Sequence, residues 1–319
     1  MQHKTISFDS GQPGTHHYHQ WMPDKTKPIA WLHIMHGMSE HSARYAHFAE
    51  FLNQQGIMVT AGDHRVHGLT GSSADSLYHM GDNDSWDQMV NDQWQLINHI
   101  AAEQQLPLVI LGHSMGSFMA TQFCQQYAQQ LHDKHSGRLA GLILSGSNYD
   151  SPTTFKVAAG AAWIERARLG GRNISNFLEQ LSFGSFNRSF KPARTDKDWL
   201  SSDENAVDTY IADPWCGGAL STQSWYDFMN GLAKLSQPKS MAQINADLPI
   251  YVLSGDLDPV GGRGKGVVKL QSALQQAGVK QVDLKLYEGG RHEMLNETNR
   301  QQVYQDILRW LKKALENNA

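Results

Sequence analysis

Short apolar runs alternate along this chain with longer segments in which apolar residues recur at helical spacing. The runs at residues 29–35, 56–61, 106–111, 139–144, 249–253 and 282–287 predict strands, because each is short and mainly apolar. Helical periodicity predicts helices at about 43–54, 86–102, 114–131 and 264–276, and near the C-terminus in the stripe Val303, Ile307, Trp310, Leu311 and Leu315. This α/β alternation predicts a mostly parallel sheet with helices on both faces.

Two segments depart from this alternation. Residues 5–8 and 16–21 flank the turn sequence Gly11-Gln12-Pro13-Gly14 and predict an antiparallel hairpin at the start of the sheet. Between 148 and 240 the pattern gives way to short helical pieces that are rich in large apolar side chains: Phe155, Trp163, Phe177, Phe183, Phe186, Phe190, Trp199, Trp215, Trp225, Tyr226 and Phe228. We expect 148–240 to be an inserted helical cap, and 1–147 with 241–319 to form the core. Ligand sites in open parallel sheets lie outside the carboxyl ends of the strands, where such a cap would stand.

Composition narrows the class of protein. The 319 residues carry a net charge of −4, so no nucleic-acid partner is expected. The chain contains no run of about 18 apolar residues, so no membrane span is predicted. The first 20 residues lack the apolar core of a secretory signal. Cys124 and Cys216 are too few for a disulfide framework and are expected to be reduced, buried thiols. We therefore expect a cytoplasmic globular protein, and its oligomeric state stays open.

Ser114 is the first candidate for chemistry. It lies between Gly112 and Gly116, directly after the apolar run 106–111 and before a helical pattern. A tight strand-to-helix turn lifts a serine hydroxyl above the sheet edge, and small residues on both sides let the backbone segments approach closely. The N–H groups at the start of the following helix point toward the same position. We predict that Ser114 is a nucleophile; the alternative is the serine of a flexible glycine loop.

A serine on such a turn needs an acid and then a histidine later in the chain. Fifteen of the 16 histidines lie at or before His135, so His292, in the loop after the run 282–287, is the one candidate base. The acid should follow the run 249–253, where Asp256 and Asp258 both stand. We favour Asp258, because it lies farther from the strand and can reach the next loop, whereas Asp256 is placed to brace the turn. His292 would take the serine proton, and Asp258 would orient the imidazole.

The loop after the first parallel strand reads HGMSEHSARY, residues 36–45. A glycine directly after a strand lets the loop fold back, so the backbone N–H groups of Met38 and Met115 are our candidate oxyanion donors. Together with GHSMG, GDLD and RHEM, this stretch resembles the α/β-hydrolase superfamily, and within it the monoacylglycerol lipase and bacterial lysophospholipase-like branch. The resemblance covers roughly residues 25–315.

The resemblance implies an α/β-hydrolase fold with an eight-stranded type of sheet and an inserted cap. It also implies a triad of Ser114, Asp258 and His292, with Met38 and Met115 at the oxyanion positions. The chain departs from the branch at residues 63–68, which read DHRVHG instead of D-x-R-G-H-G, so Val66 stands in place of a glycine. A metal site at His64 and His67 is less favoured than a structural loop, because no acidic or cysteine partner stands at ligand spacing.

These inferences predict a serine hydrolase that cleaves carboxylic esters of single-chain acyl lipids, such as monoacylglycerol or lysophospholipid, through an acyl-enzyme. We expect no cofactor and no metal, and the residues that bind the substrate stay open. The apolar cap predicts an acyl-chain wall and transient contact with membrane or micelle surfaces. A thioesterase or a peptidase with the same triad, and a non-catalytic ligand-sensing protein on the same scaffold, are the alternatives. Dehalogenases and epoxide hydrolases of this fold need an aspartate at position 114.

Overall fold

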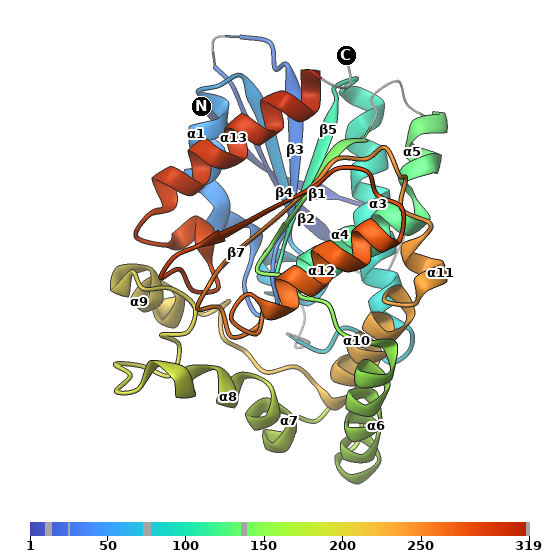
Figure 1. The fold of residues 1–319 in the computed structure, drawn as a ribbon, viewed down its shortest axis with the longest axis vertical. Coiled ribbons are helices and arrows are strands. Elements are labelled where there is room, and N and C mark those ends of the chain that lie inside the picture. The colour runs from blue at the N-terminus through green and yellow to red at the C-terminus, as the bar shows by residue number, and fades with distance from the viewer. Residues whose placement is uncertain (10–14, 25, 73–77, 135–138, 317–319) are drawn as a thin grey trace.

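The computed structural model describes residues 1–9, 15–24, 26–72, 78–134 and 139–316, which form an eight-stranded sheet in the order β1-β2-β4-β3-β5-β6-β7-β8 (Figure 1). The strands are β1 (Gln2–Phe8), β2 (His16–Met22), β3 (Ala30–Met35), β4 (Ile57–Gly62), β5 (Leu108–His113), β6 (Leu139–Ser145), β7 (Ile250–Gly255) and β8 (Val282–Tyr287). β2 pairs antiparallel with β1 and β4, and every later pair is parallel. The predicted hairpin is present, although its turn at 11–14 lies outside the described residues. The predicted α/β architecture is confirmed.

Helices cover both faces of the sheet (Figure 1). α1 (Ala46–Asn53) and α13 (Arg300–Glu316) share a buried cluster with one face, and α3 (Ser85–Glu103), α4 (Met115–Gln126) and α12 (Lys265–Gln276) share a larger cluster with the other. β3, β4, β5 and β7 are buried at every position. Strands covered on both faces read as continuous apolar runs rather than alternating ones, which explains the pattern in the sequence.

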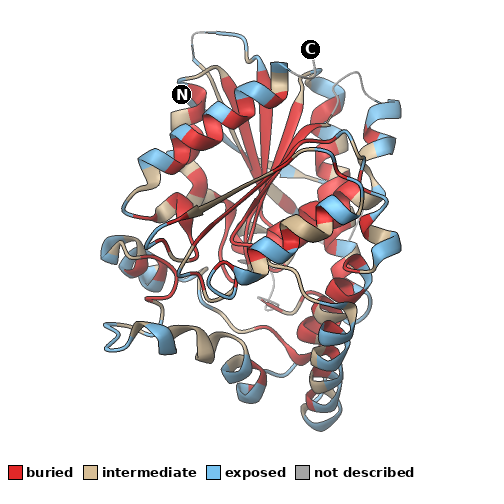
Figure 2. Cartoon of the chain, in the orientation of Figure 1, coloured by how far each residue is buried: buried red, intermediate tan, exposed pale blue. Residues whose placement is uncertain are grey.

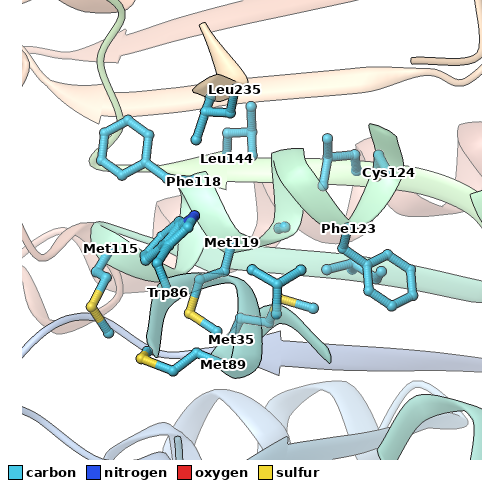
Figure 3. Packing of buried hydrophobic residues seen from close by; sticks show 14 of the residues in the cluster. Met35, Trp86, Met89, Met115, Phe118, Met119, Phe123, Cys124, Leu144 and Leu235 are labelled. Atoms are coloured by element: carbon cyan, nitrogen blue, oxygen red, sulfur yellow. The ribbon is translucent and has the colours of Figure 1, made fainter. Parts of the chain in front are cut away.

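Aromatic rings and methionines fill the space between α4, α3 and the sheet. Figure 3 shows Phe118, Met119 and Phe123 of α4 packed with Trp86 and Met89 of α3. All five side chains are at most 8 % exposed. This packing fixes the position of α4, and with it the position of the turn that precedes the helix.

Two local predictions need correction. The single helix expected over 114–131 is two helices, α4 and α5 (Ala128–Lys134), separated by Tyr127, whose φ of −122° lies outside the helical region. There the Tyr127 ring stacks on Trp94 at 5.1 Å between centroids, and this tertiary contact outweighs helical continuity. The other correction concerns the cysteines: both are free thiols, but only Cys124 is buried, and Cys216 is half-buried.

A helical segment connects β6 to β7. It contains α6 (Pro152–Leu169), α7 (Asn176–Leu181), α8 (Phe183–Phe186), the 3-10 turn Asn187–Phe190, α9 (Glu204–Ala212), α10 (Thr222–Leu235) and α11 (Pro238–Met241). α6 packs along α10, and the segment lies beyond one end of the sheet (Figure 1). Much of α6 and α7 faces solvent (Figure 2).

The remaining elements are short: the 3-10 turns Ser42–Tyr45 and Met294–Asn296, and α2 (Gly68–Ser72). None of the helices in the described part of the chain is both long enough and apolar enough to cross a bilayer.

Candidate active site

Ser114 occupies the turn between β5 and α4 in a strained backbone conformation. Its φ of 52° and ψ of −121° lie outside the regions that non-glycine residues favour. The neighbouring glycines allow this geometry: a Cβ at Gly116 would overlap the backbone of Met35, and a Cβ at Gly112 would overlap that of Gly116. The turn is also fixed by the Ser114 amide, which donates to the Ser145 carbonyl at 2.9 Å. The close approach expected from the sequence is therefore present.

His292 and Asp258 form a buried pair in the loops after β8 and β7. His292 Nδ1 lies 3.1 Å from both carboxylate oxygens of Asp258, and the two side chains are 3 % and 0 % exposed. Asp258 also accepts hydrogen bonds from the Ser254 hydroxyl and the Val260 amide, both at 2.9 Å. Because the carboxylate accepts at Nδ1, the neutral imidazole has its proton on Nδ1, and Nε2 is the available base.

Electrostatics in this pair favour the charged forms. Burial opposes an imidazolium, but the Asp258 carboxylate and its hydrogen bond outweigh burial and raise the pKa of His292 above 6.5. Burial likewise opposes a carboxylate at Asp258, yet His292, Ser254 and the Val260 amide together lower the pKa of Asp258 below 3.8.

Asp256, the alternative acid, has a different position. Its Oδ1 accepts a hydrogen bond from the Gly289 amide at 2.8 Å, so it braces the loop that carries His292. The structure therefore places both aspartates near the histidine loop, but only Asp258 contacts the imidazole.

One small cavity, of about 40 Å³, is lined by Ser114, His292 and Met38. A Cβ at Gly37 would lie 3.2 Å from the Ser114 Cβ, so the loop after β3 runs directly past the serine. Met115, the other predicted amide donor, is the first residue of α4. Among the hydrogen bonds of the described residues, none joins the Ser114 hydroxyl to His292, and none uses the amide of Met38 or Met115.

The rest of the cavity wall comes largely from the helical segment. Phe183, Trp199 and Leu200 supply apolar surface, and Glu179 and Lys197 supply charge. Glu179 accepts a hydrogen bond from the Trp225 indole at 3.2 Å, and burial raises the pKa of its carboxyl above 4.5. Sequence reasoning counted Phe183 and Trp199 among the aromatic residues of the expected acyl-chain wall. It gave Leu200, Glu179 and Lys197 no role, because no motif orders this irregular region.

The histidine loop is hydrogen-bonded to the helical segment as well. The amides of His292 and Glu293 donate to the carbonyls of Trp199 and Leu200 at 3.4 and 2.7 Å, and the rings of Trp199 and His292 lie 5.1 Å apart. Arg291 donates to the carbonyls of Asp198 and Ser201. The position of His292 thus depends on residues about 90 positions earlier in the chain.

A buried ionic network joins the loop after β3 to the histidine loop. Arg44 donates to Glu40 at 2.6 Å and to both oxygens of Glu293 at 2.8 and 2.7 Å, and these three side chains are 11 %, 4 % and 6 % exposed. Glu40 also accepts from the Gly37 amide at 2.6 Å and from the Tyr45 hydroxyl at 2.9 Å. Sequence reasoning recognised HGMSEHSARY but gave its Glu40 and Arg44 no role; the signal was a buried-type loop with paired charges four residues apart.

The segment 63–68 is a structural loop in this fold. Val66, which stands where the related branch has glycine, keeps a left-handed φ of 63°, a strained conformation for a β-branched residue. His64 donates from Nε2 to the His36 carbonyl, and its amide donates to His36 Nε2, both at 3.0 Å. Burial lowers the pKa of His64 to about 3, so the residue stays neutral and supports the strand end before Gly37.

Comparison with known proteins shows which family the chain belongs to. The family model described as serine aminopeptidase, S33 matches residues 26–299. A monoacylglycerol lipase from Mycolicibacterium smegmatis is 28 % identical over 305 residues, covering 93 % of each chain. The human monoglyceride lipase is 27 % identical over 305 residues, covering 92 % of this chain and 85 % of its own length. The structure of a thermostable carboxyl esterase from Bacillus coagulans in complex with glycerol superposes with a TM-score of 0.87 at 28 % identity, covering 98 % of this chain and 99 % of the other.

These matches confirm the resemblance inferred from the motifs, and they agree with the strand order and the serine turn. The chain belongs to the serine aminopeptidase S33 family of α/β-hydrolases, in the branch of the monoglyceride lipases.

Proposed function

We propose that this chain is a serine hydrolase that cleaves carboxylic esters of single-chain acyl lipids, such as monoacylglycerol or lysophospholipid. The observation that carries the proposal is the buried His292–Asp258 pair, in one cavity with a serine on a strained strand-to-helix turn. The names of the relatives, monoacylglycerol lipase and carboxyl esterase, support the same substrate class.

In the proposed reaction, Ser114 Oγ attacks the ester carbonyl carbon while neutral His292 accepts the serine proton at Nε2. The amides of Met38 and Met115 donate to the oxyanion of the tetrahedral intermediate; each is expected to contribute about 3 kcal/mol of transition-state stabilisation. The imidazolium, stabilised by Asp258, then protonates the departing alkoxide and leaves an acyl-enzyme. Water repeats these steps: His292 accepts its proton, the hydroxide attacks the acyl carbon, and Ser114 Oγ leaves with the proton that His292 returns.

We propose that residues 148–240 form a cap that opens to admit substrate. The cavity of about 40 Å³ is far smaller than the 300 Å³ or more that ligand sites generally offer, so the closed arrangement has no room for an acyl chain. Phe183, Trp199 and Leu200 line it from the cap side and would form the start of the acyl-chain wall.

We further propose that the outer face of the cap touches lipid surfaces. Large apolar side chains on and beside α6 and α7 are 54 to 72 % exposed: Val157, Trp163, Ile164, Ile174, Phe177 and Leu181. Exposed large apolar side chains gathered on neighbouring helices are typical of contact with a lipid surface. Replacing Trp163 and Ile164 with serine should lower activity on micellar substrate and leave activity on a dispersed short-chain ester unchanged. An equal loss on both substrates would contradict the surface role.

A second candidate is peptide hydrolysis, because the matched family is described as a serine aminopeptidase. The deciding experiment compares kcat/KM on a monoacylglycerol, a lysophospholipid, an acyl-CoA thioester and an aminoacyl amide, together with fluorophosphonate labelling of the intact chain. Labelling at Ser114 that is lost in Ser114→Ala, with the highest kcat/KM on a glycerol ester, supports the proposal. Absence of labelling would favour a ligand sensor, and preference for the amide would favour the peptidase.

A further inference from the structure

His41, Asp213 and Cys216 form a compact cluster outside the catalytic cavity. One candidate ligand atom from each residue lies within 4.8 Å of the other two, and within the described residues this is the one such group of three. His41 belongs to the loop after β3, three residues beyond Met38, whereas Asp213 and Cys216 belong to the turn after α9. The cluster therefore bridges the core and the proposed cap.

The imidazole in this cluster has one ring nitrogen without a partner. His41 Nε2 lies 2.8 Å from Asp213 Oδ2, but Nδ1 is buried and has no hydrogen-bond partner among the residues that the structure describes. The His41 side chain is only 7 % exposed. Because the two ring nitrogens point in different directions, Nε2, which faces Asp213, is the candidate ligand atom, and Nδ1 is not part of the cluster.

Local structure holds the other two ligands on one side of their turn. The Cys216 amide donates to the Asp213 carbonyl at 3.1 Å, and the Trp215 amide donates to Asp213 Oδ1 at 2.8 Å. Asp213 Oδ2 faces His41, and the half-buried Cys216 is a free thiol whose sulfur lies within 4.8 Å of the candidate ligand atoms of the other two residues. His41 and Asp213 also line an open groove of about 740 Å³ beside α1 and α9, through which an ion and its water can reach them.

We propose that His41, Asp213 and Cys216 bind a Zn²⁺ ion, with water as the fourth ligand. Imidazole nitrogen, carboxylate oxygen and thiolate sulfur in tetrahedral arrangement are the ligands that Zn²⁺ prefers. The ion displaces the proton of the Cys216 thiol, so one proton is released for each ion bound. Because each bound ion releases this proton, affinity should rise with pH.

Bound zinc would hold the proposed cap against the core. The Ser39 carbonyl already accepts from the Gly217 amide and from the Tyr210 hydroxyl, each at 2.9 Å, so the two segments touch on both sides of the cluster. Because the closed cavity is too small for an acyl chain, a metal clamp at this junction would slow substrate entry. The site would therefore be inhibitory, and it is distinct from the chemistry at Ser114.

The test uses the whole chain with Co²⁺ and Zn²⁺ in turn. Co²⁺ should produce a near-ultraviolet thiolate-to-cobalt charge-transfer band, and Zn²⁺ should remove that band, raise Tm by a few degrees and inhibit ester hydrolysis. Cys216→Ser should abolish the band and weaken inhibition at least about tenfold, with basal activity unchanged. Cys124→Ser, which removes the buried thiol in α4, is the matched control and should behave as wild type.

Two outcomes would overturn the proposal: absence of a thiolate band, or equal inhibition of wild type and Cys216→Ser by zinc. The band and the Tm shift do not depend on catalysis. A chain that binds metal in this way but never hydrolyses esters would therefore refute the proposed function and not the metal site.

Discussion

Arg44 offers the sharpest test of how the site is held together. Its guanidinium pairs with Glu40 and Glu293 and lies 4.9 Å from the ring centroid of Tyr210. Arg44→Met keeps much of the side-chain volume and removes the charge. Two carboxylates then remain in a site where each is less than 7 % exposed, and water cannot reach them without opening the loops.

The size of the effect follows from Glu293. Burial disfavours its charged form, but Arg44 and neighbouring donors hold the pKa of Glu293 at about 2 instead of 4.5, a difference that corresponds to roughly 3 kcal/mol. Loss of one partner from a buried ion pair generally costs about 3 to 5 kcal/mol. Because domains of this kind are stable by about 5 to 15 kcal/mol, a loss of about 3 to 5 kcal/mol in Arg44→Met should remove roughly a fifth or more of the free energy of unfolding at pH 7.

The direction of the Glu293 pKa shift determines how the destabilisation by Arg44→Met depends on pH. The folded-state pKa of Glu293 is depressed, so its stabilising contribution is fully present above about pH 4.5 and is lost as pH falls toward 2. The penalty in Arg44→Met should therefore be largest near neutral pH and shrink on acidification, when the stranded carboxylates become protonated. Adding Glu293→Gln to Arg44→Met should recover part of the stability at pH 7, because an amide is less costly to bury than a charge.

The measurement is urea unfolding at several pH values, followed by fluorescence. Arg172→Met is the matched control, since Arg172 pairs with Asp82 at 2.7 Å on the open surface, where the side chains are 69 % and 61 % exposed, and such pairs contribute little. A destabilisation by Arg44→Met no greater than that of the control, or one independent of pH, would refute the description of a buried charged network.

The remaining predictions concern the acid and the nucleophile turn. Asp258→Asn should lower kcat by roughly four orders of magnitude, whereas Asp256→Asn should have a much smaller effect; a larger loss at Asp256 would show that it is the acid. In the wild type, kcat/KM should rise with pH as His292 loses its proton, with a midpoint above 6.5, and loss of the Asp258 carboxylate should move that midpoint to lower pH. Gly116→Ala should destabilise the fold by about 3 kcal/mol, because its Cβ would overlap the backbone of Met35. Gly160→Ala in α6, where a Cβ has nothing within 4 Å, should instead stabilise slightly in urea unfolding.

The fold was largely predictable because the sheet is buried on both faces. Each central strand had to be apolar throughout, so its position was visible without tertiary information. The break at Tyr127 was not visible, because it depends on a ring stacked from another helix. The order and extent of the short helices between β6 and β7 were equally hidden, since their apolar residues face several different partners.

The residues of the candidate site likewise fall into those that the sequence could predict and those that it could not. Ser114, Asp258 and His292 could be predicted as candidates because each lies in the loop or turn that follows a strand, and the carboxyl ends of parallel strands meet at one edge. Trp199 and Lys197 have no such reference point; they reach the cavity only through the path of the helical segment. Arg44 was visible in the motif, yet its partner Glu293 lies 249 positions away, so local spacing could not reveal the bond.

The proposed nucleophile, Ser114, and the proposed base, His292, are therefore held by different kinds of restraint. Backbone contacts within the core fix Ser114, because Gly112 and Gly116 let the turn pack directly against neighbouring backbone and the Ser114 amide donates to the Ser145 carbonyl. His292 is fixed from two directions: by Asp258 and the Arg44 network on the core side, and by the carbonyls of the 198–201 segment on the other. If that segment moves when substrate enters, it moves the base relative to a stationary nucleophile. On the proposed function, closure of this segment and alignment of His292 would then be one event, because the segment is hydrogen-bonded to the histidine loop.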